Sequence, residues 1–323
     1  MRRWSRPLAL IALVASVLPA AAQDYPARPI RFIASQGPGG LSDVWMRAAA
    51  DGMGPILGGT VVVENHTGAA GSIGARACAD APPDGYTFCI MPPEPITTNP
   101  IIFPNQGFDP NKSLTPVTRP FYLTQVFAVN ASLGVKTFDQ LAALAKAKPK
   151  TLNYTAPSLP KVAFMENFNK THGTDIVRVP FKGGGDGVNN MLTGTTPIAI
   201  FGIGNVIQFI RAGKIVGFAV DGDKRSPLAP EIATFRELGY TQHIGAASFG
   251  IYAPTGTPKP IVDKVHAAIV KVASNPEFQQ RNMIPRGLAP VLNSPEEFAK
   301  ELVADRAEAL ADIKDSGLYP EVK

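Results

Sequence analysis

The sequence predicts an α/β fold of two lobes, in which each lobe is a mainly parallel sheet flanked by helices. Short β-branched runs alternate with helical patterns along the whole chain, which is typical of strands joined by helical crossovers. The chain has 323 residues, of which 45% are hydrophobic. That length exceeds what one hydrophobic core usually organises, so we expect two domains.

The first 22 residues have the pattern of a secretory signal peptide. Three arginines precede an apolar run over residues 8–18, and Ala20-x-Ala22 offers a cleavage site before Gln23. The apolar run is too short to span a bilayer, which needs about 20 helical residues. We therefore expect export with cleavage, and an uncleaved anchor is the alternative.

Charge and cysteine content exclude some partners. Removing residues 1–22 takes away three of the 31 basic residues and none of the 26 acidic ones, which leaves a net charge of +2. So small a charge, without a basic cluster, argues against nucleic acid as a partner. In an oxidising compartment Cys78 and Cys89 either form a disulfide or remain two small buried side chains.

The first lobe is expected to repeat a unit of strand, loop and helix. Its strands are predicted at residues 30–34, 61–63 and 86–91, and its helices at residues 41–57 and 73–81. The first helix is inferred from apolar residues at helical spacing, and the Gly58-Gly59 pair ends it. The proline-rich passage over residues 92–120 is expected to be irregular.

The second lobe is predicted to begin with a strand at residues 125–129. A helix at 141–146 follows, with Thr137 and Gln140 as its capping box. Further strands are predicted at residues 152–155, 176–179, 198–201 and 216–220.

The last segment is expected to return to the first lobe. It contains a predicted strand at 249–254, a helix at 260–273 and a helix that Ser294 opens as N-cap. The last helix has an apolar stripe, bordered by Asp305, that consists of Phe298, Leu302, Ala309 and Ile313. Lobe 1 is thus predicted to comprise residues 23–122 and 248–323, and lobe 2 residues 123–247. Two crossings between lobes make a hinge beside a ligand cleft.

Two glycine-rich loops stand where strands end and helices begin. One runs from Gln36 to Asp43, and the other from Asn65 to Gly74. Open α/β sheets bind ligands at this edge, and the free N–H groups of helix N-termini attract anions. The loops therefore predict an anion clamp of backbone N–H groups, with a turn that binds nothing as the alternative for either loop alone.

Signals for nucleotide binding and for catalysis are missing from the sequence. The loops have neither the P-loop pattern nor the glycine spacing of a dinucleotide fingerprint. No H-E-x-x-H, C-x-x-C or G-x-S-x-G pattern occurs, and the histidines are scattered at His66, His172, His243 and His266. We therefore expect no enzyme, no catalytic residue, no metal site and no cofactor.

Eight motifs follow one another over nearly the whole chain after residue 22. They are YPARPI (25–30), GGLSD (39–43), VVVEN (61–65), GAAGSIG (68–74), PDGYT (83–87), VPFKGG (179–184), IRAGK (210–214) and APTGTPKP (253–260). Together they resemble the signatures of the Bug family of periplasmic substrate-binding proteins. The resemblance implies a Venus-flytrap fold, a periplasmic monomer, a small organic carboxylate as ligand, and delivery to a membrane permease of one large and one small subunit.

The resemblance also implies a set of ligand-binding residues. In the first loop they are Gln36, Gly39, Gly40, Leu41, Ser42 and Asp43, and in the second Thr67, Gly68, Ala69, Ala70, Gly71 and Ser72. Outside these loops they are Glu94, Ser158, Lys161, Phe181, Lys182, Gly183, Gly184, Phe201 and Asn205.

Three positions depart from the family's pattern. Lys161 ends a shortened loop and either meets a distal carboxylate or is a solvated surface lysine. The negative charge of Glu94 would repel a second carboxylate of the ligand, unless Glu94 is ion-paired or accepts a hydrogen bond from a ligand hydroxyl or ammonium. Phe201 either packs on an apolar ligand body or belongs to the core. Together they predict a carboxylate with an apolar or aromatic body rather than citrate. An ordinary dicarboxylate is the alternative ligand, and a sensor with a signalling partner is the alternative function.

Overall fold

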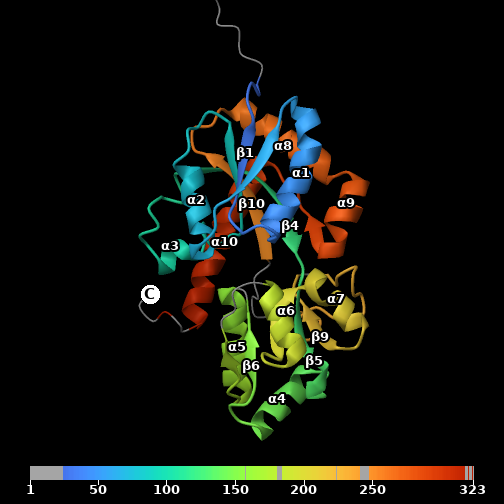
Figure 1. The fold of residues 1–323 in the computed structure, drawn as a ribbon. Coiled ribbons are helices and arrows are strands. Elements are labelled where there is room, and N and C mark those ends of the chain that lie inside the picture. Colours follow the sequence, from blue (N-terminus) through green and yellow to red (C-terminus); the bar gives the residue numbers. More distant parts are fainter. Residues whose placement is uncertain are drawn as a thin grey trace, which may run out of the picture.

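The computed structural model describes residues 25–156, 158–179, 184–222, 224–240 and 247–316, together with residues 319 and 322. The first lobe holds a sheet of β1 (Ile30–Ala34), β2 (Val61–Asn65), β3 (Thr87–Met91), β4 (Leu114–Leu123), β10 (Ala247–Pro254) and β11 (Leu288–Pro290). The second lobe holds a sheet of β5 (Gln125–Asn130), β6 (Asn153–Thr155), β7 (Val177–Arg178), β8 (Ile198–Gly202) and β9 (Ile215–Val220). The two lobes are stacked end to end (Figure 1).

Helices cover both faces of each sheet (Figure 1). They are α1 (Leu41–Leu57), α2 (Ser72–Ala79), α3 (Asn99–Ile102), α4 (Phe138–Ala147), α5 (Leu159–His172), α6 (Gly184–Thr193), α7 (Ile203–Arg211), α8 (Lys259–Ala273), α9 (Pro276–Asn282) and α10 (Pro295–Ser316). The short 3-10 helices are η1 (Ala69–Gly71), η2 (Ala131–Leu133) and η3 (Ile284–Arg286). None of the described helices is long and apolar enough to cross a membrane.

Both sheets are mixed rather than mainly parallel as expected. The strand orders are β11-β4-β10-β3-β1-β2 and β7-β6-β8-β5-β9. β1 runs parallel to β2 and β3, and β6 runs parallel to β7 and β8, whereas β10 and β5 run antiparallel to their neighbours. The antiparallel strands are those next to the crossings. β10 enters the first sheet from the end that faces the second lobe, so it runs against β3.

Side chains along each strand point alternately to the two faces of the sheet, which explains why each sheet has a hydrophobic core on both faces. In β1, Ile30 and Phe32 face the core shared with α1 and α8, whereas Ile33 faces the core shared with α2 and α10. In β5, Phe127 faces α4 and α5, and Val126 faces α6 and α7. Each sheet is therefore a buried middle layer, and its strand ends are left to form the edge of a cleft.

The passage over residues 92–120 is not irregular throughout, because it contains α3 and most of the ten-residue strand β4. Pro116 and Pro120 lie within this strand, although proline cannot donate to a sheet ladder. The pairing of β4 with β10 accommodates them through register shifts on either side of Ile251. The remaining predicted elements lie within three residues of the observed ones, and α5, α6, α7, α9, β11 and the 3-10 helices are additional.

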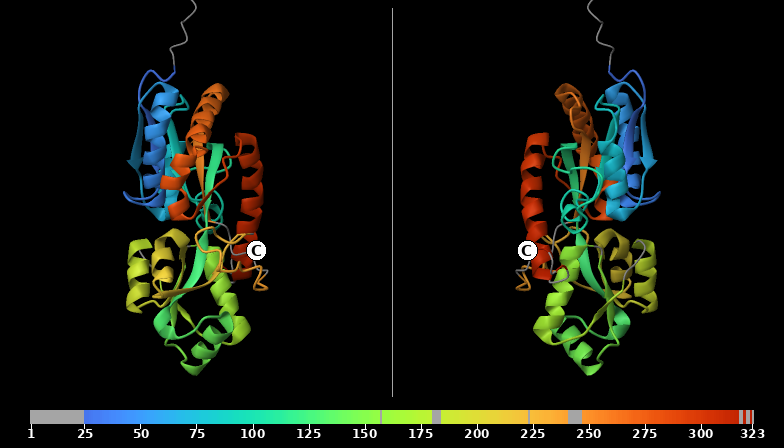
Figure 2. Two further views of the ribbon diagram at one scale, coloured as in Figure 1. Left: turned by 90° about the vertical axis from the view of Figure 1, so that its right-hand side faces the viewer. Right: turned by 90° about the vertical axis from the view of Figure 1, so that its left-hand side faces the viewer.

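Residue Thr124 and helix α10 both join the lobes. Thr124 alone separates β4 in the first sheet from β5 in the second. The last helix, α10, packs on β4 of the first lobe and on α5 of the second, so that it spans the junction (Figure 2). Its predicted capping box is confirmed, since the N–H of Glu297 donates to Ser294 Oγ and the N–H of Ser294 donates to Glu297 Oε2.

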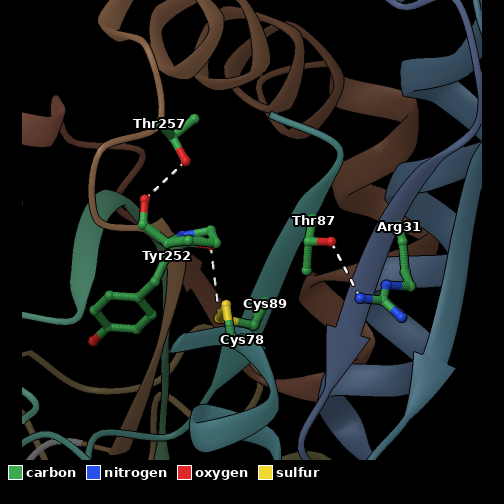
Figure 3. Close-up of a disulfide and its surroundings, with 7 residues drawn as sticks. Arg31, Cys78, Thr87, Cys89, Tyr252 and Thr257 are labelled. Atoms are coloured by element: carbon green, nitrogen blue, oxygen red, sulfur yellow. Dashed lines mark hydrogen bonds between the residues drawn. A yellow bond between two sulfur atoms is a disulfide. The ribbon is translucent and has the colours of Figure 1, made fainter. Parts of the chain in front are cut away.

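Cys78 and Cys89 form a disulfide, so the first of the two alternatives for this pair is confirmed (Figure 3). The bond ties α2 to β3 within the first lobe, and both cysteines are buried. It lies behind the second glycine-rich loop, which leads into α2.

Candidate functional site

A cavity of about 1070 Å³ lies between the lobes. The first lobe contributes both glycine-rich loops, the turn after β3, and one face of α10. The second lobe contributes the start of α5 and the end of β8 with the start of α7. The cavity therefore sits at the carboxyl ends of β1, β3 and β8, where α/β sheets bind ligands.

The first loop is shaped by hydrogen bonds from its own side chains. Asp43 Oδ2 accepts from the N–H of Gly39 at 2.9 Å, while its Oδ1 accepts from Arg47 at 2.8 Å and from Asn65 at 2.9 Å. Burial raises the pKa of Asp43, but these hydrogen bonds and the Arg47 charge outweigh it and hold the pKa below its ordinary value. Asp43 is thus a buried structural carboxylate and does not line the cavity.

Internal bonds occupy several of the donors expected for an anion. The N–H of Gly40 donates to the carbonyl of Gly37 at 2.9 Å, and the N–H of Ser42 donates to Gln36 Oε1 at 3.0 Å. Gly40 therefore lines the cavity without a free N–H, which corrects its expected role as a donor. Leu41 also lines the cavity, and as the first residue of α1 its N–H has no partner inside the helix.

The second loop has an unusual backbone. Ala69 and Ala70 have φ values of 47° and 49°, in the left-handed region that L-residues with a Cβ rarely adopt. Each such residue costs about 1 kcal/mol or more, and strain of this kind gathers at functional sites. Gly71 follows at φ 90°, and a Cβ there would lie 3.0 Å from Pro95 Cγ. Its N–H donates to the carbonyl of Gly68 at 3.0 Å, which corrects its expected role as a ligand donor.

Only part of the second loop reaches the cavity. Gly68, Ala70 and Gly71 line it, whereas Thr67 and Ala69 are exposed elsewhere. Ser72 is buried, donates to Gln106 Oε1 at 2.6 Å and accepts from Asn99 at 2.9 Å. These bonds anchor the start of α2 behind the loop, so Ser72 is placed as a support.

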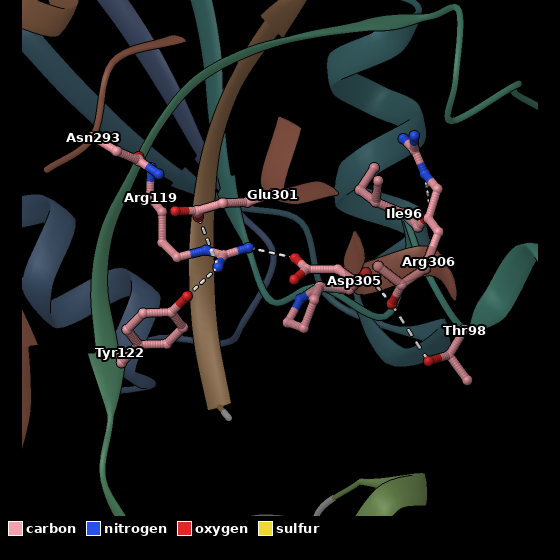
Figure 4. A network of polar contacts seen from close by, with 10 residues as sticks. Ile96, Thr98, Arg119, Tyr122, Asn293, Glu301, Asp305 and Arg306 are labelled. Atoms are coloured by element: carbon pink, nitrogen blue, oxygen red, sulfur yellow. Dashed lines mark hydrogen bonds and ion pairs between the residues drawn. The ribbon is translucent and has the colours of Figure 1, made fainter. Parts of the chain in front are cut away.

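A charged network of β4 and α10 forms part of the cavity wall (Figure 4). Arg119 of β4 is buried, pairs with Glu301 at 2.9 Å and with Asp305, and donates to the hydroxyl of Tyr122. All four residues line the cavity. Sequence reasoning missed this wall because Arg119 lay in the passage expected to be irregular. The spacing of the acids of α10, at residues 301, 305, 308 and 312, was the available signal, since it places them on one helical face.

Lys161 is not a solvated surface lysine. Its side chain is 1% exposed, and its Nζ lies 3.7 Å from Oδ2 of Asp221, which is 7% exposed. Lys161 also lines the cavity, so it is a buried, paired ammonium at the junction of the lobes. No local pattern indicated Asp221 as its partner, since 60 residues separate the two along the chain.

The other second-lobe candidates differ in their surroundings. Phe201 is 3% exposed and packs with Val126 and Ile203 in the core, yet it also lines the cavity. Ser158, the N-cap of α5, and the exposed Asn205 line the cavity as well. Gly184 begins α6. Phe181, Lys182 and Gly183 lie outside the described residues.

Further residues line the cavity that sequence reasoning did not single out. Ser35 and Gln125 are each 5% exposed, and their side chains carry a polar atom without a hydrogen-bond partner among the described residues, Oγ in Ser35 and Oε1 in Gln125. Glu94 Oε2 is also buried without a hydrogen-bond partner among the described residues. Polar atoms buried without partners are rare and mark places where a ligand or water completes the bonding. Within the described part of the chain, no group of three His, Cys, Asp or Glu side chains is arranged for a metal ion.

Comparisons with known proteins agree with this geometry. A family model described as tripartite tricarboxylate transporter family receptor matches residues 45–317. Protein BugT of Bordetella pertussis is 30% identical over 310 residues, covering 94% of this chain and 93% of BugT. A UPF0065 protein in the gbd 5′ region of Cupriavidus necator is 31% identical over 280 residues, covering 84% of this chain and 83% of that protein.

Solved structures are similar over nearly the whole described fold. One titled as a periplasmic transporter has a TM-score of 0.80 at 33% identity, covering 90% of this chain and 97% of its own. An R. palustris protein with adipate has a TM-score of 0.81 at 27% identity, covering 91% and 99%. The periplasmic binding protein BugD has a TM-score of 0.75 at 28% identity, covering 92% and 98%.

Proposed function

We propose that this chain binds a small organic carboxylate with an apolar body between its lobes. The chain belongs to the family of tripartite tricarboxylate transporter receptors. The observation that carries the proposal is the meeting of Leu41, at the start of α1, with Gly68 and Ala70 on one side of the cavity. A hydrogen bond to a charged group contributes about 1.5–3 kcal/mol. A micromolar site needs about 8 kcal/mol in all, so a few backbone donors together with apolar contacts suffice.

The apolar body of the ligand is supported by the lining and by a relative. Phe201, Leu123 and Phe249 line the cavity beside the polar loops. Burying a methylene chain or a ring against them would contribute about 25 cal/mol per Å². The R. palustris relative holds adipate, whose carboxylates are separated by a methylene chain. These contacts favour such an acid over citrate.

We further propose how the receptor works. Residues 23–122 with 248–323, and residues 123–247, act as lobes that close on the ligand around Thr124 and the start of β10. Residues 1–22 direct export to the periplasm, and the monomeric receptor delivers its ligand to a permease of one large and one small subunit. The family match supports this transport role over a sensor with the same fold.

Titration of residues 23–323 with citrate, succinate, adipate and benzoate by calorimetry, beside a thermal-shift screen, tests the proposal. A ligand present at 100 times its Kd should stabilise the protein by about 2.7 kcal/mol. The diamide of adipate serves as the matched control and should not bind, since it lacks the anion. Tightest binding to citrate would refute the apolar body. A folded protein that binds none of these acids and no amino carboxylate either would refute the carboxylate site.

A further inference from the structure

We propose that the ligand carries an ammonium group besides its carboxylate, and that Glu94 is the acceptor for it. This inference rests on the proposed carboxylate site and deepens it from organic acids in general to amino carboxylates.

Glu94 is held beside the second glycine-rich loop. It lies in the turn between β3 and α3, where its carbonyl accepts from the N–H of Asn99 at 2.8 Å. A Cβ added at Gly71 would lie 3.0 Å from Cγ of Pro95, the residue after Glu94. The turn that holds Glu94 is therefore in direct contact with the second glycine-rich loop. Glu94 lines the cavity, and its Oε2 is buried without a hydrogen-bond partner among the described residues.

Gln125 presents a second acceptor in the same condition. Its side chain is 5% exposed and lines the cavity, and its Oε1 has no partner in the described part of the chain. A buried acceptor without a donor destabilises the protein, because it has lost its hydrogen bonds to water and gained none in return. These two acceptors would be satisfied by a ligand that brings hydrogen-bond donors, which a second carboxylate lacks at neutral pH. Arg119 Nε, a buried donor of the same cavity that has no partner among the described residues, would be satisfied by the ligand's own carboxylate.

The charged side chains that line the cavity also favour a ligand ammonium over a second carboxylate. Five acidic and three basic side chains are found among its described lining residues. Two of the basic groups are already paired with acids: Arg119 with Glu301 and Asp305, and Lys161 with Asp221. Arg286 remains as the base that a second carboxylate would need, and its guanidinium donates to the carbonyl of Arg281 at 3.0 Å.

An ammonium satisfies this environment better than a hydroxyl does. Burial raises the pKa of the Glu94 carboxyl, which means that its charged form lacks stabilisation in spite of the nearby Lys161. A ligand hydroxyl would supply a donor but no charge. An ammonium supplies both, and a charge-assisted bond is about twice as strong as a neutral one.

The experiment compares acids on one carbon skeleton by calorimetry with residues 23–323. The set is hexanoate, adipate, 2-aminohexanoate and 6-aminohexanoate, with the corresponding acids of butanoate as a shorter set. At least one ammonium acid should bind about tenfold or more tightly than both the plain acid and the diacid, since one charge-assisted bond is worth that much. The two amino positions show whether the ammonium lies next to the carboxylate or at the far end.

The Glu94→Gln variant keeps the size of the side chain and removes its charge, and it should abolish the ammonium advantage. Asp51→Asn, which removes an exposed acid of α1 away from the cavity, is the matched control and should retain it. Tightest binding of the diacid, with loss of that binding in Arg286→Gln, would overturn the inference and leave the carboxylate site intact. An ammonium advantage that persists in Glu94→Gln would overturn the role of Glu94. Failure of every acid to bind would overturn both proposals.

Discussion

Lys161 and Asp221 form an ion pair in the buried junction of the two lobes, with Nζ and Oδ2 3.7 Å apart. Burial lowers the pKa of the Lys161 ammonium and raises the pKa of the Asp221 carboxyl to about 6. Asp221 Oδ1 also accepts from the N–H of Gln125 at 2.6 Å, at the start of β5. The pair thus connects α5, which carries Lys161, to β9, which ends just before Asp221, and to β5, which begins at Gln125.

Breaking this pair should destabilise the protein strongly. Lys161→Met leaves a buried carboxylate and Asp221→Asn leaves a buried ammonium, so each should lower the free energy of unfolding by about 3–5 kcal/mol. The double variant should lose less than the sum of the two single losses, because it removes both members of the pair and leaves neither without the other. Urea denaturation of the four proteins measures this coupling. Additive losses would show that the two groups do not interact.

A single backbone donor can be deleted at the start of α1. Leu41→Pro fits the first helical position, because proline is favoured there and Gly40 has the extended backbone that a residue before proline prefers. The variant should weaken carboxylate binding about tenfold or more, since it removes one bond to a charged group. Leu41→Ala shortens the side chain but keeps the N–H. Equal affinities of the two variants would remove Leu41 from the clamp.

Asp43 should make the stability of the first loop depend on pH. Its pKa in the folded protein is below the ordinary value of 3.8, so the unfolded state takes up the proton first as the pH falls. The stability that Asp43 contributes is fully present above about pH 4 and declines as the pH falls through its folded pKa. Asp43→Asn should therefore flatten the acid limb of a plot of unfolding free energy against pH. A limb of unchanged slope contradicts this account.

The disulfide should contribute stability behind the second loop. Cys78 and Cys89 are 11 residues apart, and closing a loop of this length stabilises a protein by about 2–3 kcal/mol through the unfolded chain. The Cys78→Ala, Cys89→Ala double variant should lose this amount in guanidinium denaturation. Reducing the unaltered protein should have a similar effect, and the double variant itself should not respond to the reductant.

The order of most elements and the place of the two glycine-rich loops were determined by the sequence alone. Both depend on local physics: apolar residues at helical spacing predicted α1, β-branched runs predicted β1 and β2, and the Ser294 capping box predicted the start of α10. These signals lie within a few residues of one another along the chain.

What surrounds the ligand was decided by the tertiary structure. Arg119 meets Asp305, and Lys161 meets Asp221, across separations of 186 and 60 residues that no local pattern encodes. The strand β4 was hidden by its prolines, because it pairs with β10 only through two register shifts at which β4 carries an extra residue. Gly40 was expected to donate to the ligand, but the loop closes on itself and uses that N–H internally. Long-range pairing and loop closure are properties of the folded chain, so the chemistry of the cavity wall appeared only once the lobes were assembled.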